Sequence, residues 1–249
     1  MTLMVAIIFI YGLFIGSFLN VCIYRIPEGK SVVSPPSSCG NCGHRLSFLD
    51  MIPVLNYFIY KGKCRYCGAS FSIQYPLIEL LNGILYLLIF MKYGLSLQFV
   101  LYDGIASLLI VISIIDLNTK TIPDGINLFG GIFTVLLGIY LFRGDYLYHF
   151  YGFLFGFLLF LLIAVVTNAM GGGDIKLMGV LGILFGLEGI IFTTVISFIY
   201  GAVISSGLII SGKASRKDFI PFGPFISLAA LTYILVGDII LELYFNIIF

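Results

Sequence analysis

Long apolar stretches constrain this chain more than any other feature of its sequence. A bilayer core of about 30 Å is crossed by about 20 mostly apolar helical residues, and such stretches recur along nearly the whole chain. Of the 249 residues, 60% are hydrophobic and only 10% are charged, whereas a soluble domain carries about 25% charged residues. The sequence therefore predicts an all-α polytopic membrane protein.

Eight apolar segments can be drawn, and each is expected to be helical. They cover residues 2–23, 76–93, 97–115, 126–142, 147–168, 175–186, 188–211 and 220–246. The sixth is too short to cross alone, so we expect it to be tilted, partly re-entrant or fused to its neighbour through Gly186. The first lacks a basic start and a small-residue cleavage site, and we interpret it as a retained span rather than a signal peptide.

The distribution of basic residues predicts the orientation, because cytoplasmic loops are enriched in Lys and Arg. If the N-terminus lies outside, the outer loops hold only Lys92 and Arg143. The inner loops then hold the other eleven basic residues, namely Arg25, Lys30, Arg45, Lys61, Lys63, Arg65, Lys120, Lys176, Lys213, Arg216 and Lys217. The one long polar interruption, residues 24–75, is therefore expected in the cytoplasm.

Four of the five cysteines form two CxxC pairs within this polar loop. The pairs Cys39/Cys42 and Cys64/Cys67 are each followed by a glycine, which suits the tight turn that brings two thiolates onto one ion. Four thiolates at this spacing are typical of a tetrahedral structural Zn²⁺ site. Two disulfides are the alternative, but they are rare in the reducing cytoplasm. We therefore favour zinc in a purely structural role, since four thiolates leave no open position on the metal.

These assignments divide the chain into three parts. Residues 1–23 are expected to form the first transmembrane helix, residues 24–75 a small cytoplasmic zinc-ribbon-like loop domain, and residues 76–249 the transmembrane core. The loop has few apolar residues for a core, so a metal would supply much of its folding energy.

Two aspartates end up on one face of the membrane. Asp116 follows the third apolar segment and Asp174 the fifth, and the chain crosses out and back between them. The three glycines Gly171, Gly172 and Gly173 lack Cβ atoms, so the backbone before Asp174 can approach another helix or an extended peptide closely. Carboxylates at membrane boundaries usually face a partner or a cavity.

Two interpretations of this pair stay open on physical grounds. A single aspartate at the end of a span is most often a helix cap or an interfacial charge. Two aspartates in close approach would instead share a proton, so that one activates a water and the other donates a hydrogen bond to the carbonyl oxygen of a scissile peptide. Asp124, after Pro123, is expected in a turn or cap, and Asp103, Asp238 and Glu242 at the outer interface.

A transporter or proton channel is an alternative class, because intramembrane acids also mark ion paths. No internal repeat is evident in the sequence, however, and the two acids lie at one face. A non-catalytic assembly or scaffold protein, with the zinc loop as a docking module, is a further alternative.

The motifs taken in order resemble the prepilin peptidase family of GxGD-type membrane aspartic proteases. The resemblance spans nearly the whole chain, from Gly16-Ser17-Phe18-Leu19-Asn20-Val21 through the CxxC pairs and Tyr75-Pro76-Leu77-Ile78-Glu79 to the Asp116 and Asp174 segments. It implies that Asp116 and Asp174 are the catalytic dyad of a protease core. Gly172 fills the variable position between the family's two glycines. The auxiliary residues would be Asp124, Gly171, Gly172, Gly173 and Lys176.

The resemblance also implies the substrates and a second activity. The substrates would be type IV prepilins or pseudopilins, cut at the cytoplasmic face of a bacterial inner membrane, with no nucleic acid partner. Many bacterial members also methylate the new N-terminal amine with S-adenosylmethionine, an activity associated with the N-terminal part and the loop. The candidate residues for methyl transfer are Glu79, Gly62, Asn20 and Arg25, although Gly62 also fits an ordinary turn.

Overall fold

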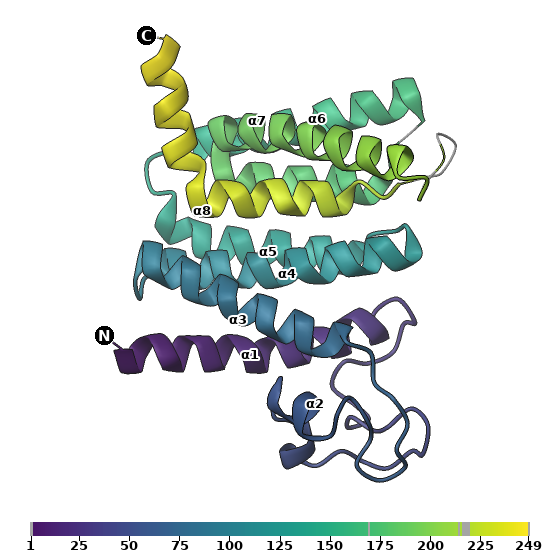
Figure 1. The fold of residues 1–249 in the computed structure, drawn as a ribbon. Coiled ribbons are helices and arrows are strands. Elements are labelled where there is room, and N and C mark those ends of the chain that lie inside the picture. The colour runs from purple at the N-terminus through teal and green to yellow at the C-terminus, as the bar shows by residue number, and fades with distance from the viewer. Residues whose placement is uncertain (1, 169, 214, 216–219, 249) are drawn as a thin grey trace. The chain divides into compact units, whose positions relative to one another are not determined.

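The computed structural model describes residues 2–168, 170–213, 215 and 220–248, and within them the chain is helical without β-strands (Figure 1). The helices are α1 (Thr2–Arg25), the short 3-10 helix η1 (Phe48–Met51), α2 (Leu55–Ile59), α3 (Gln74–Tyr93), α4 (Leu97–Thr119), α5 (Asp124–Leu141), α6 (Tyr146–Thr167), α7 (Gly172–Ile210) and α8 (Gly223–Ile248). Seven helices in this part of the chain are long and apolar enough to cross a membrane. The expected multi-pass, all-α membrane architecture is confirmed.

The helices gather in two compact units, Met1–Leu95 and Ser96–Phe249. In the first unit, α1 packs on α3 through Gly12 and Gly16, whose spacing lets two helices approach closely. A Cβ atom at Gly16 would lie 2.7 Å from the Cα of Glu79, and the Asn82 side chain donates a hydrogen bond of 2.8 Å to the Gly12 carbonyl. The polar loop between the two helices belongs to the same unit.

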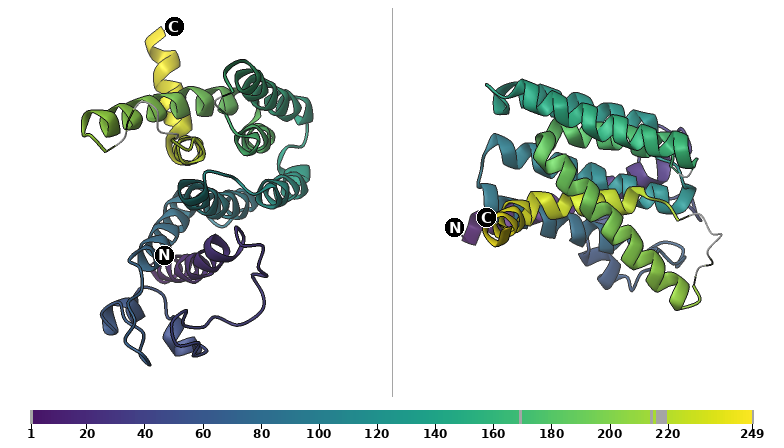
Figure 2. Two further views of the ribbon diagram at one scale, coloured as in Figure 1. Left: turned by 90° about the vertical axis from the view of Figure 1, so that its right-hand side faces the viewer. Right: turned by 90° about the horizontal axis from the view of Figure 1, so that it is seen from above.

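In the second unit, α7 packs against α5, α6 and α8, and α4 packs against α5 and α8 (Figure 2). The fully buried side chains include Phe160 of α6, Leu181 and Ile190 of α7, and Ile226 and Ile234 of α8. These helices hold both aspartates of the predicted dyad.

Helix α7 is broken at Gly186, where the backbone has φ 69° and ψ −171°. The residues before the break run antiparallel to α6, because Gly156 lies against Met178 and Gly152 against Gly182. The residues of α7 after the break run parallel to α6, because Gly156 lies against Ile190 and the Phe160 ring lies 5.9 Å from the Phe198 ring. The chain therefore turns back at Gly186.

The side chain of Tyr148 supports this break. A Cβ atom at Gly186 would lie 1.9 Å from the Cε1 atom of the Tyr148 ring, and the Tyr148 hydroxyl accepts a hydrogen bond of 2.9 Å from the Glu188 backbone N–H. The sixth and seventh predicted segments thus meet at Gly186 within α7, but the chain reverses there, so they form two antiparallel helical parts of α7 rather than one continuous span.

Candidate functional site

Asp116 lies in the last turn of α4 and is only 4% exposed. Its Oδ2 accepts a hydrogen bond of 3.0 Å from the backbone N–H of Gly223, the first residue of α8. The first N–H groups of a helix have no partner within the helix. Asp116 therefore satisfies one of them, and the close fit leaves no room for a side chain at Gly223, whose Cβ would lie 2.6 Å from Oδ2.

Asp174 lies in the first turn of α7 and is 6% exposed. Its Oδ2 accepts a hydrogen bond of 3.3 Å from the Gly171 N–H. Its Oδ1 is buried and has no hydrogen-bond partner among the described residues. One oxygen of this carboxyl group is therefore free to bind a water or a substrate group.

Ile122 lies between the two aspartates. A Cβ atom at Gly173, next to Asp174, would lie 2.7 Å from the Ile122 Cβ, and one at Gly223, next to Asp116, would lie 3.1 Å from its Cδ1. The structure thus brings together, in one unit, the two aspartates that the sequence placed on one face.

The three glycines before Asp174 have different surroundings. A Cβ atom at Gly171 would make an ordinary contact of 3.5 Å with the Asp174 Oδ2, and one at Gly172 would meet nothing within 4 Å. At Gly173 it would collide with Ile122. The Gly173 carbonyl also accepts a hydrogen bond of 3.0 Å from the Asn127 side chain of α5. Gly173 is therefore the position where this loop needs the absence of a side chain most.

Asp124 and Lys176 form an ion pair of 2.7 Å beside the buried aspartates. The Asp124 side chain is 72% exposed, so it lies at the surface and outside the buried carboxyl pair. The pair joins the first turn of α5 to the first turn of α7.

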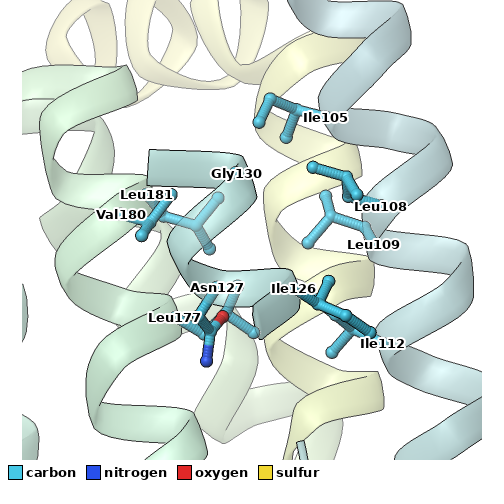
Figure 3. A pocket seen from close by; sticks show the side chains of 10 residues that line it. All are labelled: Ile105, Leu108, Leu109, Ile112, Ile126, Asn127, Gly130, Leu177, Val180 and Leu181. Carbon is cyan, nitrogen blue, oxygen red and sulfur yellow. The ribbon is translucent and has the colours of Figure 1, made fainter. Parts of the chain in front are cut away.

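A small cavity lies between α4, α5 and α7 (Figure 3). Its volume of about 10 Å³ is close to that of one water molecule. Asn127 is the polar side chain in its lining, and its Oδ1 is buried without a hydrogen-bond partner among the described residues. The cavity is too small for a substrate.

The four CxxC cysteines converge in the first unit. Their Sγ atoms all lie within 4.8 Å of one another, and the Sγ atoms of Cys39 and Cys67 are 3.8 Å apart. A tetrahedral zinc with Zn–S bonds of about 2.3 Å has S···S edges of about 3.8 Å. All five cysteines are free thiols, so the disulfide alternative is not what the structure contains.

Each CxxC pair is folded as a tight turn. The Gly43 N–H donates to the Cys39 carbonyl and the Gly68 N–H to the Cys64 carbonyl, each at 2.9 Å. Both glycines have positive φ, 70° and 74°, as the sequence pattern suggested.

The thiols of this cluster differ in acidity. The N–H groups of Cys42 and Asn41 lower the pKa of Cys39 to about 6, and the Ala69 N–H lowers the pKa of Cys67. The pKa of Cys42, lowered by the His44 N–H but raised more by burial and by the thiols of Cys67 and Cys39, is about 11. Because the thiolate is the metal ligand, this donor set fits a metal ion, and the cluster could hold one.

A second, larger cavity of about 690 Å³ lies in the first unit, between the loop and the adjoining ends of α1 and α3. Three of the methyl-transfer candidates line it, namely Asn20, Arg25 and Glu79. Binding sites for small molecules typically measure about 300–1,000 Å³.

The lining polar groups are held by the loop and by neighbouring helices. The Glu79 carboxylate accepts hydrogen bonds from the Val54 N–H at 2.8 Å and from the Ser17 hydroxyl, rather than pairing with Arg25. Arg25 donates to the Ser31 carbonyl at 3.0 Å. The Asn20 side chain donates to the Tyr75 carbonyl at 3.1 Å.

Gly62, the fourth candidate, does not line the cavity but supports a residue that does. It has φ 67°, and a Cβ atom there would lie 2.9 Å from the ring of Tyr57, which lines the cavity. Gly62 therefore contacts the cavity wall through Tyr57, and its carbonyl accepts a hydrogen bond from the N–H of Phe71, which also lines the cavity.

Sequence reasoning missed Gly223, Asn127 and Tyr57. The run Pro221-Phe222-Gly223-Pro224 is a turn signal before an apolar segment, and Asn127 is a polar residue in an apolar stretch. These signals mark the positions, but not their contacts with the Asp116 and Gly173 segments.

Comparison with known proteins finds matches to both parts of the chain. Residues 10–93 match the bacterial peptidase A24 N-terminal domain, and residues 104–206 match the type IV leader peptidase family. No solved structure matches the chain.

Similar proteins cover nearly the whole chain. A prepilin leader peptidase/N-methyltransferase of Bacillus subtilis (strain 168) is 32% identical over 97% of this chain and 98% of its own length. The protein of the same name from Aeromonas salmonicida (strain A449) is 30% identical over 97% and 94%, and that from Pseudomonas putida is 30% identical over 92% and 89%. With both segments matched and relatives aligned from end to end, the chain belongs to the type IV leader peptidase family.

Proposed function

We propose that this protein is a membrane aspartic endopeptidase that removes the leader peptide of type IV prepilins or pseudopilins at the cytoplasmic membrane face. The observation that carries the proposal is the pair of buried carboxyl groups, Asp116 and Asp174, which meet around Ile122 in a chain of this family. The relatives are named as prepilin leader peptidases, which favours a protease over a transporter or a scaffold.

Asp116 and Asp174 act as a general acid–base pair in this proposal. The ionised carboxylate removes a proton from a water that attacks the scissile carbonyl carbon. The protonated partner donates to the carbonyl oxygen, and the roles exchange when the amine leaves. The unpartnered Oδ1 of Asp174 offers a site for the water, while Gly223 and Gly171 fix the orientation of the two carboxyl groups.

Asp116→Asn and Asp174→Asn test the dyad. Each variant should lose at least about 10²-fold in cleavage of a prepilin by the detergent-solubilised protein, since general acid–base catalysis contributes about 10²–10⁴-fold. Asp124→Asn removes the exposed ion pair with Lys176, and an auxiliary role predicts a smaller loss than in either dyad variant. Unchanged cleavage in a folded Asp116→Asn or Asp174→Asn variant would refute the proposal.

The large cavity of the first unit is the proposed site of a second reaction, N-methylation of the new N-terminal residue. When bound, S-adenosylmethionine supplies the methyl group as an electrophile. The size of the cavity and the buried carboxylate of Glu79 fit a cationic methyl donor and an amine acceptor. Glu79, Asn20 and Arg25 would hold the two reactants, and Tyr57 would shape the cavity wall.

Gly62→Ala tests this assignment against a matched control. The added Cβ should displace Tyr57 and reduce methylation while leader cleavage continues, because the two aspartates lie in the other unit. Gly29 has nearly the same φ, 65° against 67°, but nothing within 4 Å of its Cβ position. Gly29→Ala therefore imposes the same backbone strain without the collision, and it should methylate normally.

Mass spectrometry of the mature N-terminus detects the mass of the added methylene. Equal methylation by the Gly62→Ala and Gly29→Ala variants would exclude a role for Gly62 and Tyr57 in methyl transfer.

The cysteine cluster is proposed to hold one structural zinc ion through Cys39, Cys42, Cys64 and Cys67. The proposed orientation places this loop and the Asp116–Asp174 pair on the cytoplasmic side of a bacterial inner membrane, with the N-terminus outside. Eleven basic residues in the inner loops against two in the outer ones support this orientation.

A further inference from the structure

Part of the loop between α1 and α3 has an apolar outer surface. Residues 47–60, here called the 47–60 segment, contain η1 and α2 and carry a single charged residue, Asp50. Their strongly exposed side chains are Phe48, Leu49, Leu55, Phe58 and Ile59, each 60–68% exposed. An apolar patch of this kind marks a surface that another apolar phase covers.

The segment divides its side chains between two faces. Asn56, Tyr57 and Tyr60 of α2 and its C-cap line the large cavity, whereas Leu55, Phe58 and Ile59 point away from it and are exposed. The one charge is also turned inward, because the Asp50 side chain is only 5% exposed and accepts hydrogen bonds from Ser47 and Tyr66. The outward face is therefore uncharged.

A ring contact with α1 is the first indication of how deep the 47–60 segment lies along the transmembrane helices. Phe48 stacks on Phe14 of α1, with ring centroids 6.0 Å apart and an interplanar angle of 9°. Phe14 precedes Arg25, the last residue of α1, by 11 positions, which is about 16 Å along a helix. The side chain of Phe48 thus reaches well below the cytoplasmic end of the span.

The second indication is independent and comes from α3. The Val54 N–H donates to the Glu79 carboxylate at 2.8 Å, and Glu79 lies 5 residues beyond the start of α3 at Gln74, about 8 Å along the helix. Figure 1 shows the same arrangement, with α2 set back from the Arg25 end of α1 toward its N-terminus.

The backbone of the segment is suited to a medium without water. The N–H groups of Asp50, Val54, Asn56, Phe58 and Tyr60 all have partners. The side chain of Asn56 also donates to the Leu49 carbonyl. Irregular backbone at membrane depth needs its polar groups to be paired or to line a cavity, and these N–H groups are paired within the segment or with α3.

Basic residues stand on both sides of the segment. Arg45 precedes it, and Lys61, Lys63 and Arg65 follow it. Lys and Arg beside an apolar element bind the phosphate groups of the lipid surface. An apolar element with an uncharged outward face between cationic flanks is typical of an interfacial membrane segment.

We propose that the 47–60 segment is embedded in the cytoplasmic leaflet, with Phe48, Leu49, Leu55, Phe58 and Ile59 in contact with lipid acyl chains. The acyl chains are the occupant because the patch continues the lipid-facing side of α1, where Phe14 and Phe18 are themselves 38% and 47% exposed. The loop is thus divided, with the cysteine cluster in water and the segment in the bilayer. The floor of the large cavity then lies below the membrane surface.

Single tryptophans test this placement, because the chain contains no Trp of its own and gives no background emission. Phe58→Trp and Ile59→Trp would be prepared in lipid nanodiscs bounded by a scaffold protein without tryptophan, where solvent reaches both faces. Quenching is measured with iodide in the water and with bromine on the acyl chains of phosphatidylcholine. Val33→Trp, at an 84% exposed loop position, is the aqueous control, and Ile10→Trp, at a 50% exposed position of α1, is the lipid control.

The expected result is that brominated lipid quenches Phe58→Trp and Ile59→Trp about as strongly as Ile10→Trp, while iodide quenches only Val33→Trp. Two results would overturn the proposal. Iodide quenching at Val33→Trp levels would place the segment in water, and protection from both quenchers would mean that protein, such as a second copy of this chain, covers the face. Two adjacent tryptophan positions keep the test informative if one variant fails to fold.

Discussion

Gly172 and Gly173 are neighbours in the chain, yet a Cβ atom would have open space at the first and would lie 2.7 Å from Ile122 at the second. The Gly173 carbonyl is held by Asn127 as well. Pushing Gly173 away from Ile122 would move the adjacent Asp174, and a displacement of about 1 Å can reduce a rate about 10²-fold.

Gly173→Ala should therefore lose about 10²-fold or more in prepilin cleavage, while Gly172→Ala should stay within about threefold of the unmodified protein. Initial rates of leader removal by the two purified variants give the measurement. A Gly172→Ala variant that is as impaired as Gly173→Ala would show that the loop needs backbone freedom rather than close approach to Ile122.

The residues of both candidate sites differ in how well the sequence predicts them. Topology alone placed Asp116 and Asp174 on one face, and spacing alone grouped the four cysteines, because these signals lie in short motifs. The partners Gly223 and Asn127 come from other helices, and their contacts depend on three-dimensional packing. Asp103 was expected at the outer interface but is 4% exposed, because α4 turns it into the protein.

At the level of elements, apolar segments predicted helices well and their ends less well. The third segment was drawn to residue 115, but α4 continues to Thr119. The polar residues of its last turn remain helical because the Thr119 hydroxyl donates to the Ile115 carbonyl and Asp116 is buried. The short helices η1 and α2 were not predicted, because they are too short for their apolar residues to show a helical period within the polar loop.

The cysteine cluster supplies the element-scale prediction. Cys39→Ser or Cys64→Ser, or treatment with a strong chelator, should remove the metal and unfold the loop, because this part of the chain has few buried apolar residues. Metal analysis should find one zinc per chain before treatment, and limited proteolysis should then cut the loop while α1 and α3 remain intact.

Cys22→Ser is the matched control, since Cys22 is a buried residue of α1 outside the cluster and should leave the metal content unchanged. Freshly purified protein without zinc would contradict the assignment of the cluster.

At the scale of the whole molecule, the orientation can be measured directly. Alkaline phosphatase, which is active only outside the cytoplasm, can be fused after the connections between helices. Fusions after Gly94 and Gly144 should be active and fusions after Lys120 and Gly212 inactive, because the basic residues concentrate on the latter side. The reverse pattern would place the aspartate pair on the outer face and exclude cleavage at the cytoplasmic side.

The division of the chain into Met1–Leu95 and Ser96–Phe249 separates the large cavity from the two buried aspartates. Under the proposed activities, a pilin subunit must be cleaved at the aspartate pair before it is methylated in the large cavity. The N-terminal amine that accepts the methyl group is formed only when the leader is removed. A small molecule bound among Asn20, Tyr57 and Glu79 should therefore block methylation but not leader cleavage. The pilin subunits released would lack both the leader peptide and the N-terminal methyl group.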